Sequence, residues 1–237
     1  NAEVEYIKEF PKILTDLTGF HFESAPNLID TTNSTDCFSE VSSALKVSAL
    51  TLIKIANDVR LMASGPRCGL NELKVPARQP GSSIMPGKVN PVIAEVLDQT
   101  CYQVIAGDMA VTLAVENGQL ELNVMEPVLA FNLFNSFRYL TNAVRTFTEK
   151  LLKDLEANKE QCQAWVDHSV GIITALLPHI GYETCAATAK EAYATGVPIR
   201  DLILQKGLLS QAAMDRILSP YEMTHPGIAG GKDALLK

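Results

Sequence analysis

The stretch that decides the fold is DCFSEVSSALKVSALTLIKIANDVRLMAS, residues 36–64. Its apolar residues recur at alternating steps of three and four, the spacing of a helix that packs along one seam in coiled-coil fashion. The seam consists of Phe38, Val41, Leu45, Ser48, Leu52, Ile55, Val59 and Met62, and Ala49, Ile53 and Ala56 widen it. At about 1.5 Å per residue, this predicted helix is about 40 Å long.

Two more long helices are predicted downstream. The first begins after Asn90, an expected N-cap followed by Pro91 at the first helical position. Its apolar face is Ile93, Leu97, Thr100, Val104, Gly107, Val111 and Val115. The second runs from about Glu126 to Leu155, with a stripe of Leu133, Phe137, Leu140, Val144, Phe147 and Leu151. No segment alternates in the manner of a strand, so the expected fold class is all-α.

The chain changes character after Asn158. Short segments broken by proline and glycine replace the long helices, and Ser210 is an expected N-cap of a brief helix that runs through Leu218. We therefore predict a long-helix bundle in residues 1–157 and a small helical domain in residues 158–237. The long helices carry apolar residues around much of their circumference, which indicates association between subunits.

Composition narrows the classes of partner. The 237 residues are 47% hydrophobic and carry a net charge of −7, which argues against a nucleic-acid partner. An acidic protein that binds an anionic substrate needs local cations, so lysines in polar loops are of interest. No run of residues is apolar and long enough to predict a membrane span, and no signal peptide is visible.

The cysteines and histidines suggest neither disulfides nor a metal site. The cysteines are odd in number, scattered, and without a C-x-x-C pair: Cys37, Cys68, Cys101, Cys162 and Cys185. Reduced thiols in the cytoplasm are therefore expected. The four histidines lack ligand spacing, so no metal site is expected. The chain begins Asn1-Ala2 without Met, and we expect it to be a shortened piece of a longer protein.

The most unusual segment is GSSIMPGKVNP, residues 81–91, which we name the signature loop. It ends a proline- and glycine-rich connection over residues 65–90, too long for an ordinary loop in a compact helical protein. It gathers Ser82, Ser83, Lys88 and Asn90 just before a predicted helix, with Glu95 in the first turn. A cation, an amide and helix N–H groups suit a carboxylate ligand.

Each of these residues also has an ordinary structural interpretation. Ser82 and Ser83 could be turn hydroxyls, and Lys88 a solvated surface lysine. Asn90 could serve only as an N-cap, and Glu95 could only complement the helix dipole. The gathering of hydroxyls, one cation and one amide at a helix start favours a binding site.

The signature loop resembles the sequence signature of the aspartase/fumarase superfamily. An eleven-residue match of such composition rarely arises by chance. The resemblance continues in SGPR (residues 64–67) and in GQLELNVMEP (residues 118–127). It covers essentially the whole chain, as the C-terminal half of a family member. It implies a long-helix bundle, here the C-terminal part of a central domain, followed by a small helical C-terminal domain.

Within the superfamily, residues 119–127 resemble the aspartate ammonia-lyases more than the class II fumarases, which usually differ just before and after the shared Glu-Leu-Asn. Tyr221-Glu222-Met223-Thr224 in the small domain has the same resemblance. The resemblance thus implies reversible conversion of L-aspartate to fumarate and ammonium. The fumarase reaction is the alternative.

The resemblance also assigns roles. Ser82 would be the general base that removes a β-proton to give an aci-carboxylate, and Ser83 would donate to that carboxylate. Lys88 and Asn90 would bind the second carboxylate, and Glu95 would pair with a family histidine. No cofactor is implied, and no residue pattern here specifies activation by a divalent cation.

The family site is larger than what this chain holds. In the family, three subunits of a homotetramer build each site, and none of the four histidines here lies in the matching motif. We therefore expect this chain to be inactive alone. A non-catalytic helical fragment that only oligomerises is the competing interpretation.

Overall fold

The computed structural model describes residues 2–81, 84–85 and 87–231. The chain divides into two compact units, which are described separately. The bundle unit comprises Asn1–Ser64 and Val75–Glu156, and the C-terminal unit comprises Gly65–Lys74 and Ala157–Lys237. The assignment of these parts to a central and a C-terminal domain of a lyase stays a prediction.

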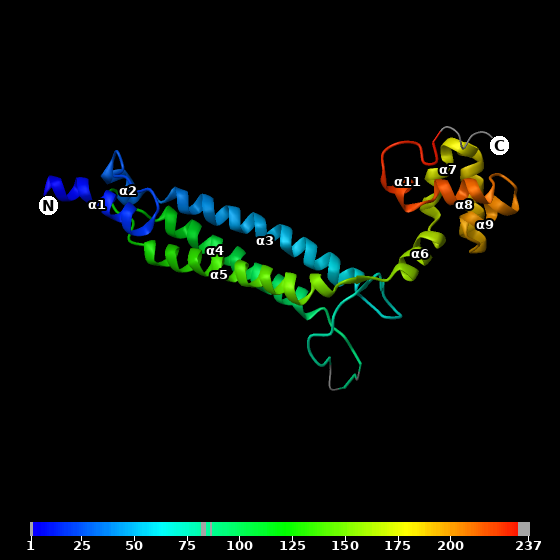
Figure 1. Cartoon of the computed structure of the whole chain (residues 1–237), viewed down its shortest axis with the longest axis horizontal. Coiled ribbons are helices and arrows are strands. Elements are labelled where there is room, and N and C mark those ends of the chain that lie inside the picture. The colour runs from blue at the N-terminus through cyan, green and yellow to red at the C-terminus, as the bar shows by residue number, and fades with distance from the viewer. Residues whose placement is uncertain (1, 82–83, 86, 232–237) are drawn as a thin grey trace. The chain divides into compact units, whose positions relative to one another are not determined.

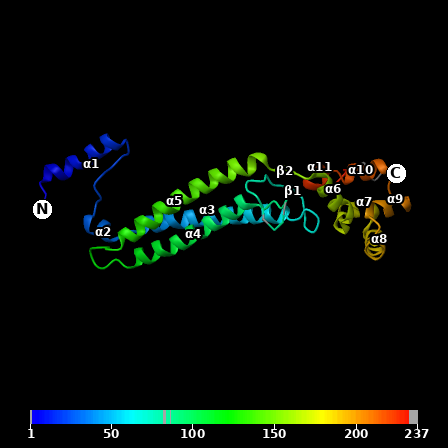
Figure 2. The same cartoon turned by 90° about the horizontal axis from the view of Figure 1, so that it is seen from below.

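Three long antiparallel helices form the bundle: α3 (Asp36–Met62), α4 (Val92–Glu116) and α5 (Glu126–Lys150). Figures 1 and 2 show them side by side over most of their length. Two helices precede them, α1 (Val4–Thr18) and α2 (Leu28–Asn33). A short 3-10 helix, η1 (Leu152–Asp154), follows α5. The prediction of an all-α fold is confirmed: the strands among the described residues, β1 (Leu73–Lys74) and β2 (Glu156–Ala157), are two residues each.

The central helix is α4, which packs against both α3 and α5. Its buried positions are Ala94, Leu97, Asp98, Cys101, Val104, Gly107, Asp108, Val111 and Ala114. Five of these residues lie outside the predicted apolar stripe, because α4 has a neighbour on two sides and therefore buries more than one face. On α5, Leu133, Leu140 and Phe147 are buried as predicted, whereas Phe137 and Val144 of the same predicted stripe are exposed.

The predicted seam of α3 is wrong in part. The buried residues of α3 are Ser42, Ala49, Ala56 and Val59, whereas Phe38, Val41 and Ile55 are each more than 40% exposed. Ser42, Ala49 and Ala56 are small and lie seven residues apart, which lets the α3 backbone come close to α4. The prediction placed large apolar side chains in the α3–α4 interface because it used hydrophobicity alone. Hydrophobicity does not indicate how closely two helices pack.

Two helix boundaries and one short strand also differ from expectation. The third long helix ends at Lys150 rather than near residue 155, because the chain tightens into η1. The connection over residues 65–90 contains β1, which pairs with β2. The second long helix begins at Val92, with Pro91 rather than Asn90 at the N-cap.

Two buried carboxylates on α4 are paired with cations on α3. Arg60 Nη1 donates to Asp98 Oδ2 at 2.9 Å, and Lys46 forms an ion pair with Asp108. Ser42 Oγ also donates to Asp108 Oδ1 at 2.8 Å. The two pairs occur in opposite order along the two helices, as an antiparallel packing requires. Because a register shift would leave both carboxylates buried and unpaired, these contacts fix the register of α4 on α3.

Burial raises the pKa values of two cysteine thiols, Cys101 on α4 and Cys185 on α8. Burial, and secondly the nearby Asp98 carboxylate, raises the pKa of Cys101 from 9.0 to about 11. Burial also raises the pKa of Cys185 above 9.0. All five cysteines are free, and Cys37 and Cys68 are exposed. Thiols with raised pKa values stay neutral near pH 7 and react poorly.

The C-terminal unit has its own core of short helices. They are α6 (Lys159–His168), α7 (Ile173–Ile180), α8 (Tyr182–Thr195), α9 (Ile199–Gln205), α10 (Gln211–Ile217) and α11 (Pro220–Thr224), with η2 (Val170–Ile172) between α6 and α7. Leu176, Ile203, Met214 and Ile217 are fully buried in that core. The predicted N-cap is confirmed, since Ser210 Oγ accepts from Ala213 N at 3.3 Å.

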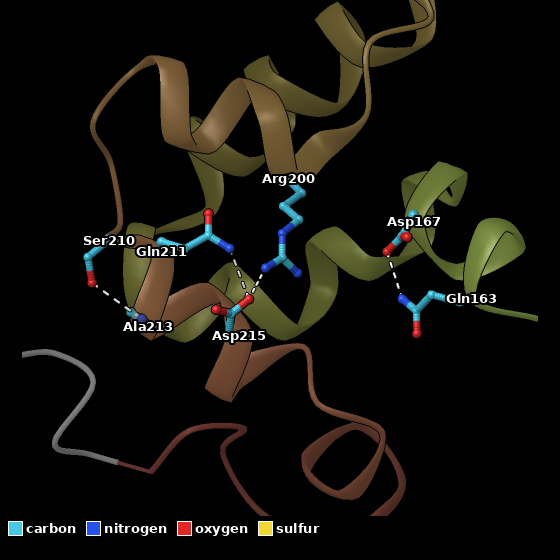
Figure 3. A network of polar contacts seen from close by, with 7 residues as sticks. All are labelled: Gln163, Asp167, Arg200, Ser210, Gln211, Ala213 and Asp215. Carbon is cyan, nitrogen blue, oxygen red and sulfur yellow. Dashed lines mark hydrogen bonds and ion pairs between the residues drawn. The ribbon is translucent and has the colours of Figure 1, made fainter. Parts of the chain in front are cut away.

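Polar contacts connect neighbouring helices of this unit. Figure 3 shows Asp215 on α10 paired with Arg200 on α9 and accepting from Gln211 Nε2 at 3.0 Å. The segment 65–74 is attached to α6 and its N-cap: Trp165 Nε1 donates to Leu70 O at 3.0 Å, and Asn158 Nδ2 donates to Asn71 O at 2.9 Å. Within residues 2–81, 84–85 and 87–231, no helix combines the length and apolar character needed to cross a bilayer.

The Arg60–Asp98 pair generates a stability prediction. Replacing Arg60 by Leu leaves the Asp98 carboxylate buried without its cation, so we expect bundle stability to fall by about 3 kcal/mol, the lower end of the range for a broken buried pair. The double variant Arg60→Leu/Asp98→Leu should recover most of that loss, because no charge stays buried. Urea unfolding of the chain measures both variants.

The control is Lys54→Gln, which removes the exposed ion pair between Lys54 and Asp58 on the same helix. Exposed pairs contribute at most about 1 kcal/mol, so this variant should stay close to the parent chain. An Arg60→Leu variant as stable as Lys54→Gln would show that the pair does not hold the register.

Candidate active site

The signature loop is the last part of the long connection between α3 and α4, and it leads into the N-terminal end of α4 at one end of the bundle (Figure 1). Ser82 and Ser83 lie outside the described residues. The described part of the loop includes a turn in which Lys88 N donates to Met85 O at 3.2 Å. The side chain of Lys88 is exposed and forms no ion pair within the described part of the chain.

Gly81 and Lys88 meet at the base of the loop. A Cβ atom at Gly81 would lie 1.9 Å from Lys88 O and 3.0 Å from Lys88 Cβ. Real Cβ atoms do not approach a carbonyl oxygen so closely, so glycine is required here unless the backbone moves. The chain segment between residues 81 and 88 is therefore closed at its base, which we call the loop neck.

Asn90 is not the N-cap of α4, which corrects the sequence prediction. Pro91 occupies the N-cap position, and no side chain caps the helix. The Asn90 amide forms no hydrogen bond to another described residue. A half-buried amide that does not cap the helix can bind a ligand, and the first N–H groups of α4 point toward the same end.

Glu95 is half-buried in the first turn of α4, as predicted, and its N–H donates to Pro91 O at 3.1 Å. Its carboxylate forms no ion pair with another described residue. Three residues further along the same helix, Asp98 is engaged by Arg60. Glu95 is thus the carboxylate near this end of α4 that stays available to an outside group.

Residues 118–127 lie at the opposite end of α4. Gln119 and Leu122 exchange backbone hydrogen bonds in a tight turn, at 2.9 and 3.1 Å. Asn123 is buried, and its Nδ2 donates to Ala114 O at 2.9 Å. The 25 residues of α4 separate this stretch from the signature loop, which at about 1.5 Å per residue is about 37 Å. One chain therefore does not bring the two motifs together.

The histidines have local roles in the described structure. His179 Nε2 lies 2.7 Å from Ala229 O, and His225 stacks on Tyr221 with ring centroids 3.9 Å apart. His168 Nδ1 lies 2.8 Å from Ala164 O. Among the described residues, no three His, Cys, Asp or Glu side chains gather where they could hold a metal ion.

Sequence reasoning missed Arg78. Its guanidinium reaches Lys150 and Asp154 at the end of α5 from the segment that precedes the loop. No motif marks this residue, because its partners lie more than 70 positions away in the sequence. Only its place three residues before Gly81 could have drawn attention to it.

The described groups at this end of the bundle can bind a carboxylate. Lys88 supplies a positive charge, and Asn90 with the α4 N–H groups supplies hydrogen-bond donors. Among the described residues at this end of α4, Glu95 is a carboxylate without an ion pair and so a group that could accept a proton.

Two family models match the chain. A model described as Lyase matches residues 1–106, and a model described as Fumarase C C-terminus matches residues 172–225. The first match includes the signature loop and Glu95. The second covers most of the small helices of the C-terminal unit.

Individual proteins match over nearly the whole chain. An aspartate ammonia-lyase from a Bacillus species is 56% identical over 98% of this chain and 50% of that protein. The structure of a cobalt-bound fumarate lyase:delta crystallin from Brucella melitensis has 42% identity and a TM-score of 0.90 over 95% of this chain and 49% of its own. The class II fumarase of Schistosoma mansoni has 34% identity and a TM-score of 0.85, covering 95% and 50%. The chain spans about half the length of these relatives.

The finding that Asn90 is not the N-cap of α4 leads to a prediction about helix stability. Because its side chain does not cap α4, Asn90→Ala should change the stability of that helix by less than about 0.5 kcal/mol, whereas the loss of a true N-cap costs about 1 kcal/mol. Ser210→Ala, which removes the observed cap of α10, is the positive control. Amide hydrogen exchange of each helix measures both, and equal losses would restore Asn90 as a cap.

Proposed function

This chain belongs to the aspartase/fumarase superfamily, and on that premise we propose that it is part of an aspartate ammonia-lyase. The whole enzyme would reversibly convert L-aspartate to fumarate and ammonium. The observation that carries the proposal is the identity to aspartate ammonia-lyases over almost the entire chain, signature loop included. It exceeds the identity to the class II fumarase structure.

The chemistry begins with removal of a proton from Cβ of aspartate. We assign this step to the alkoxide of Ser82, with the electron pair passing into the neighbouring carboxylate to form a dianionic aci-carboxylate. Ser83 would donate a hydrogen bond to that carboxylate as its charge grows. Return of the electron pair forms the C=C bond and breaks the Cα–N bond, so that ammonia and fumarate leave. Preorganised donors supply most of the stabilisation of such an intermediate.

The described residues support the binding part of this scheme. The Lys88 ammonium is exposed and unpaired among the described residues, and it would neutralise one substrate carboxylate. The Asn90 amide would donate to the same group, since it is not used as a cap. Glu95 would hold a histidine from another part of the enzyme. No metal or cofactor takes part in this proposal.

The remaining groups must come from elsewhere in the assembly. The two family motifs lie at opposite ends of α4, so one chain cannot bring both to one substrate. Large apolar side chains also stay exposed on α5, including Phe131 at 68% and Phe134 at 70%. Covering them by other subunits is favourable. We therefore propose a homotetramer whose sites combine different subunits. We also propose that the enzyme is cytoplasmic, because all five cysteines are free.

Two alternatives make different predictions. A class II fumarase would use the same loop to eliminate water from malate, and the structural likeness to the Schistosoma mansoni enzyme is its support. A non-catalytic helical piece would assemble without activity. In our proposal this chain alone is also inactive, but because it holds only part of the active site and not because the whole protein lacks catalytic activity.

The substrate assignment is tested with the full-length protein. We expect fumarate to form from L-aspartate at least 100-fold faster than from L-malate, because the residues around Gln119–Pro127 resemble aspartases. Fumarate absorbance follows both reactions under the same conditions. Faster release from L-malate would replace the proposal with the fumarase reaction.

Two variants test the assigned roles. In the full-length protein, Ser82→Ala should lower kcat at least 1,000-fold and leave assembly unchanged, because a loop hydroxyl contributes little to folding. Lys88→Ala should mainly raise KM for L-aspartate, at least tenfold, because it removes the cation that binds a carboxylate. Steady-state kinetics separates the two effects.

Lys190→Ala is the matched control, since Lys190 is an exposed lysine of α8 without an ion pair among the described residues. It should retain parental kinetics. Near-parental kcat in Ser82→Ala would remove Ser82 from the base role, and an unchanged KM in Lys88→Ala would leave Lys88 as a surface residue.

A further inference from the structure

Arg78 attaches the segment before the signature loop to the end of α5. Its Nε donates to the backbone oxygen of Lys150 at 2.6 Å, and its Nη2 forms an ion pair with Asp154. The two acceptors belong to the last residue of α5 and to η1. Arg78 itself is only 31% exposed. One guanidinium thus joins two consecutive elements of the bundle.

The chemistry of this contact favours arginine. Lys150 O lies at the negative end of the α5 dipole, where its carbonyl lacks an intrahelical partner. A guanidinium can satisfy a carbonyl and a carboxylate at once through its rigid fork, which an ammonium cannot do with the same geometry.

The acceptors are held in place by the core. Leu151, between them in sequence, is 1% exposed, and Asp154 N donates to Leu151 O at 3.1 Å. Asp154 therefore cannot move far without disturbing a buried side chain. The attachment point is part of the rigid bundle rather than of another loop.

The attachment lies close to the loop neck along the chain. Three peptide units separate Arg78 from Gly81, and an extended residue spans at most about 3.6 Å, so Gly81 lies within about 11 Å of the Arg78 Cα. Gly81 in turn is in close contact with Lys88. On the other side of the neck, Asn90 leads directly into α4. The neck is thus tethered through Arg78 to the end of α5 on one side and leads within a few residues into α4 on the other.

We infer that Arg78, through Asp154 and the end of α5, is a positioning residue that fixes the loop neck for catalysis. This inference rests on the proposed function, because it takes the signature loop to carry the base and a substrate cation. Arg78 does not contact the reacting atoms. It limits where Gly81 and Lys88 lie relative to the N-terminus of α4, and a shift of about 1 Å at such a site is costly.

The kinetic test uses the full-length protein and both members of the pair. Arg78→Gln and Asp154→Asn should each lower kcat/KM for L-aspartate at least tenfold, with kcat reduced and KM raised together. The double variant should be no more than threefold worse than either single variant, because both remove the same contact. Arg78→Lys should give an intermediate value, since it keeps the charge without the fork.

The control is Arg200→Gln. Arg200 and Asp215 are an arginine–aspartate pair with side chains 26% and 56% exposed, close to the 31% and 55% of Arg78 and Asp154. Removing this pair from the C-terminal unit should leave kcat/KM within twofold of the parent value. A tenfold loss here as well would show that any surface ion pair has this effect, and would overturn the inference.

A second measurement does not depend on activity. Hydrogen exchange of the amides in residues 84–90, including the Lys88 N–H bonded to Met85 O, should become at least tenfold faster in Arg78→Gln and in Asp154→Asn. It should stay unchanged in Arg200→Gln. Full-length protein that forms no fumarate from L-aspartate or L-malate would refute the proposed function, while this exchange comparison would still decide whether the neck is anchored.

Two results would overturn the inference. If Arg78→Gln alters the kinetics while Asp154→Asn does not, and exchange in residues 84–90 is unchanged, Arg78 acts on the substrate directly. If both variants leave exchange and kinetics at parental values, the contact has no positioning role.

Discussion

The register of α4 against α3 is the constraint on which the rest of the bundle unit depends. Small residues on α3 let the two backbones approach, and the pairs Arg60–Asp98 and Lys46–Asp108 allow one alignment. A slip by one helical turn would bury two unpaired carboxylates, each at a cost of several kcal/mol. The N-terminus of α4, with Asn90 and Glu95, is therefore set at a defined height on the bundle.

The loop neck lies next to the N-terminus of α4 in the chain. The chain enters through the Arg78 contact to α5, closes where Gly81 meets Lys88, and leaves into α4. A loop attached at both ends can hold the Lys88 cation near the N-terminus of α4. Placing catalytic groups on such a loop while the scaffold supplies rigidity is a common division of labour in enzymes.

Much of the fold could be predicted from the sequence because long periodic segments carry a strong signal. The three long helices, the change of texture after Asn158 and the Ser210 cap all follow from local patterns. The seam of α3 was predicted only in part: Ala49 and Ala56 are buried, but the packing of α4 leaves Phe38 exposed although it lies on the predicted stripe. The sequence alone does not distinguish an apolar face that stays exposed in the chain from one that is buried in its core.

Site residues that belong to a sequence motif could be predicted, whereas residues that matter through contacts with distant parts of the chain could not. Lys88, Asn90 and Glu95 follow from the signature loop, although Asn90 is free of the capping role that its sequence position indicated. Arg78 and the close approach of Gly81 depend on partners brought together only by the fold. Ser82 and Ser83 stay predictions from the resemblance.

The central claim is that this chain holds one part of a lyase site that other segments complete. The direct measurement is fumarate formation from L-aspartate by the 237-residue chain alone, and again after mixing with a separately produced N-terminal half of the same protein. The account predicts no detectable fumarate from the chain alone and clear formation from the mixture. Turnover by the chain alone would contradict it.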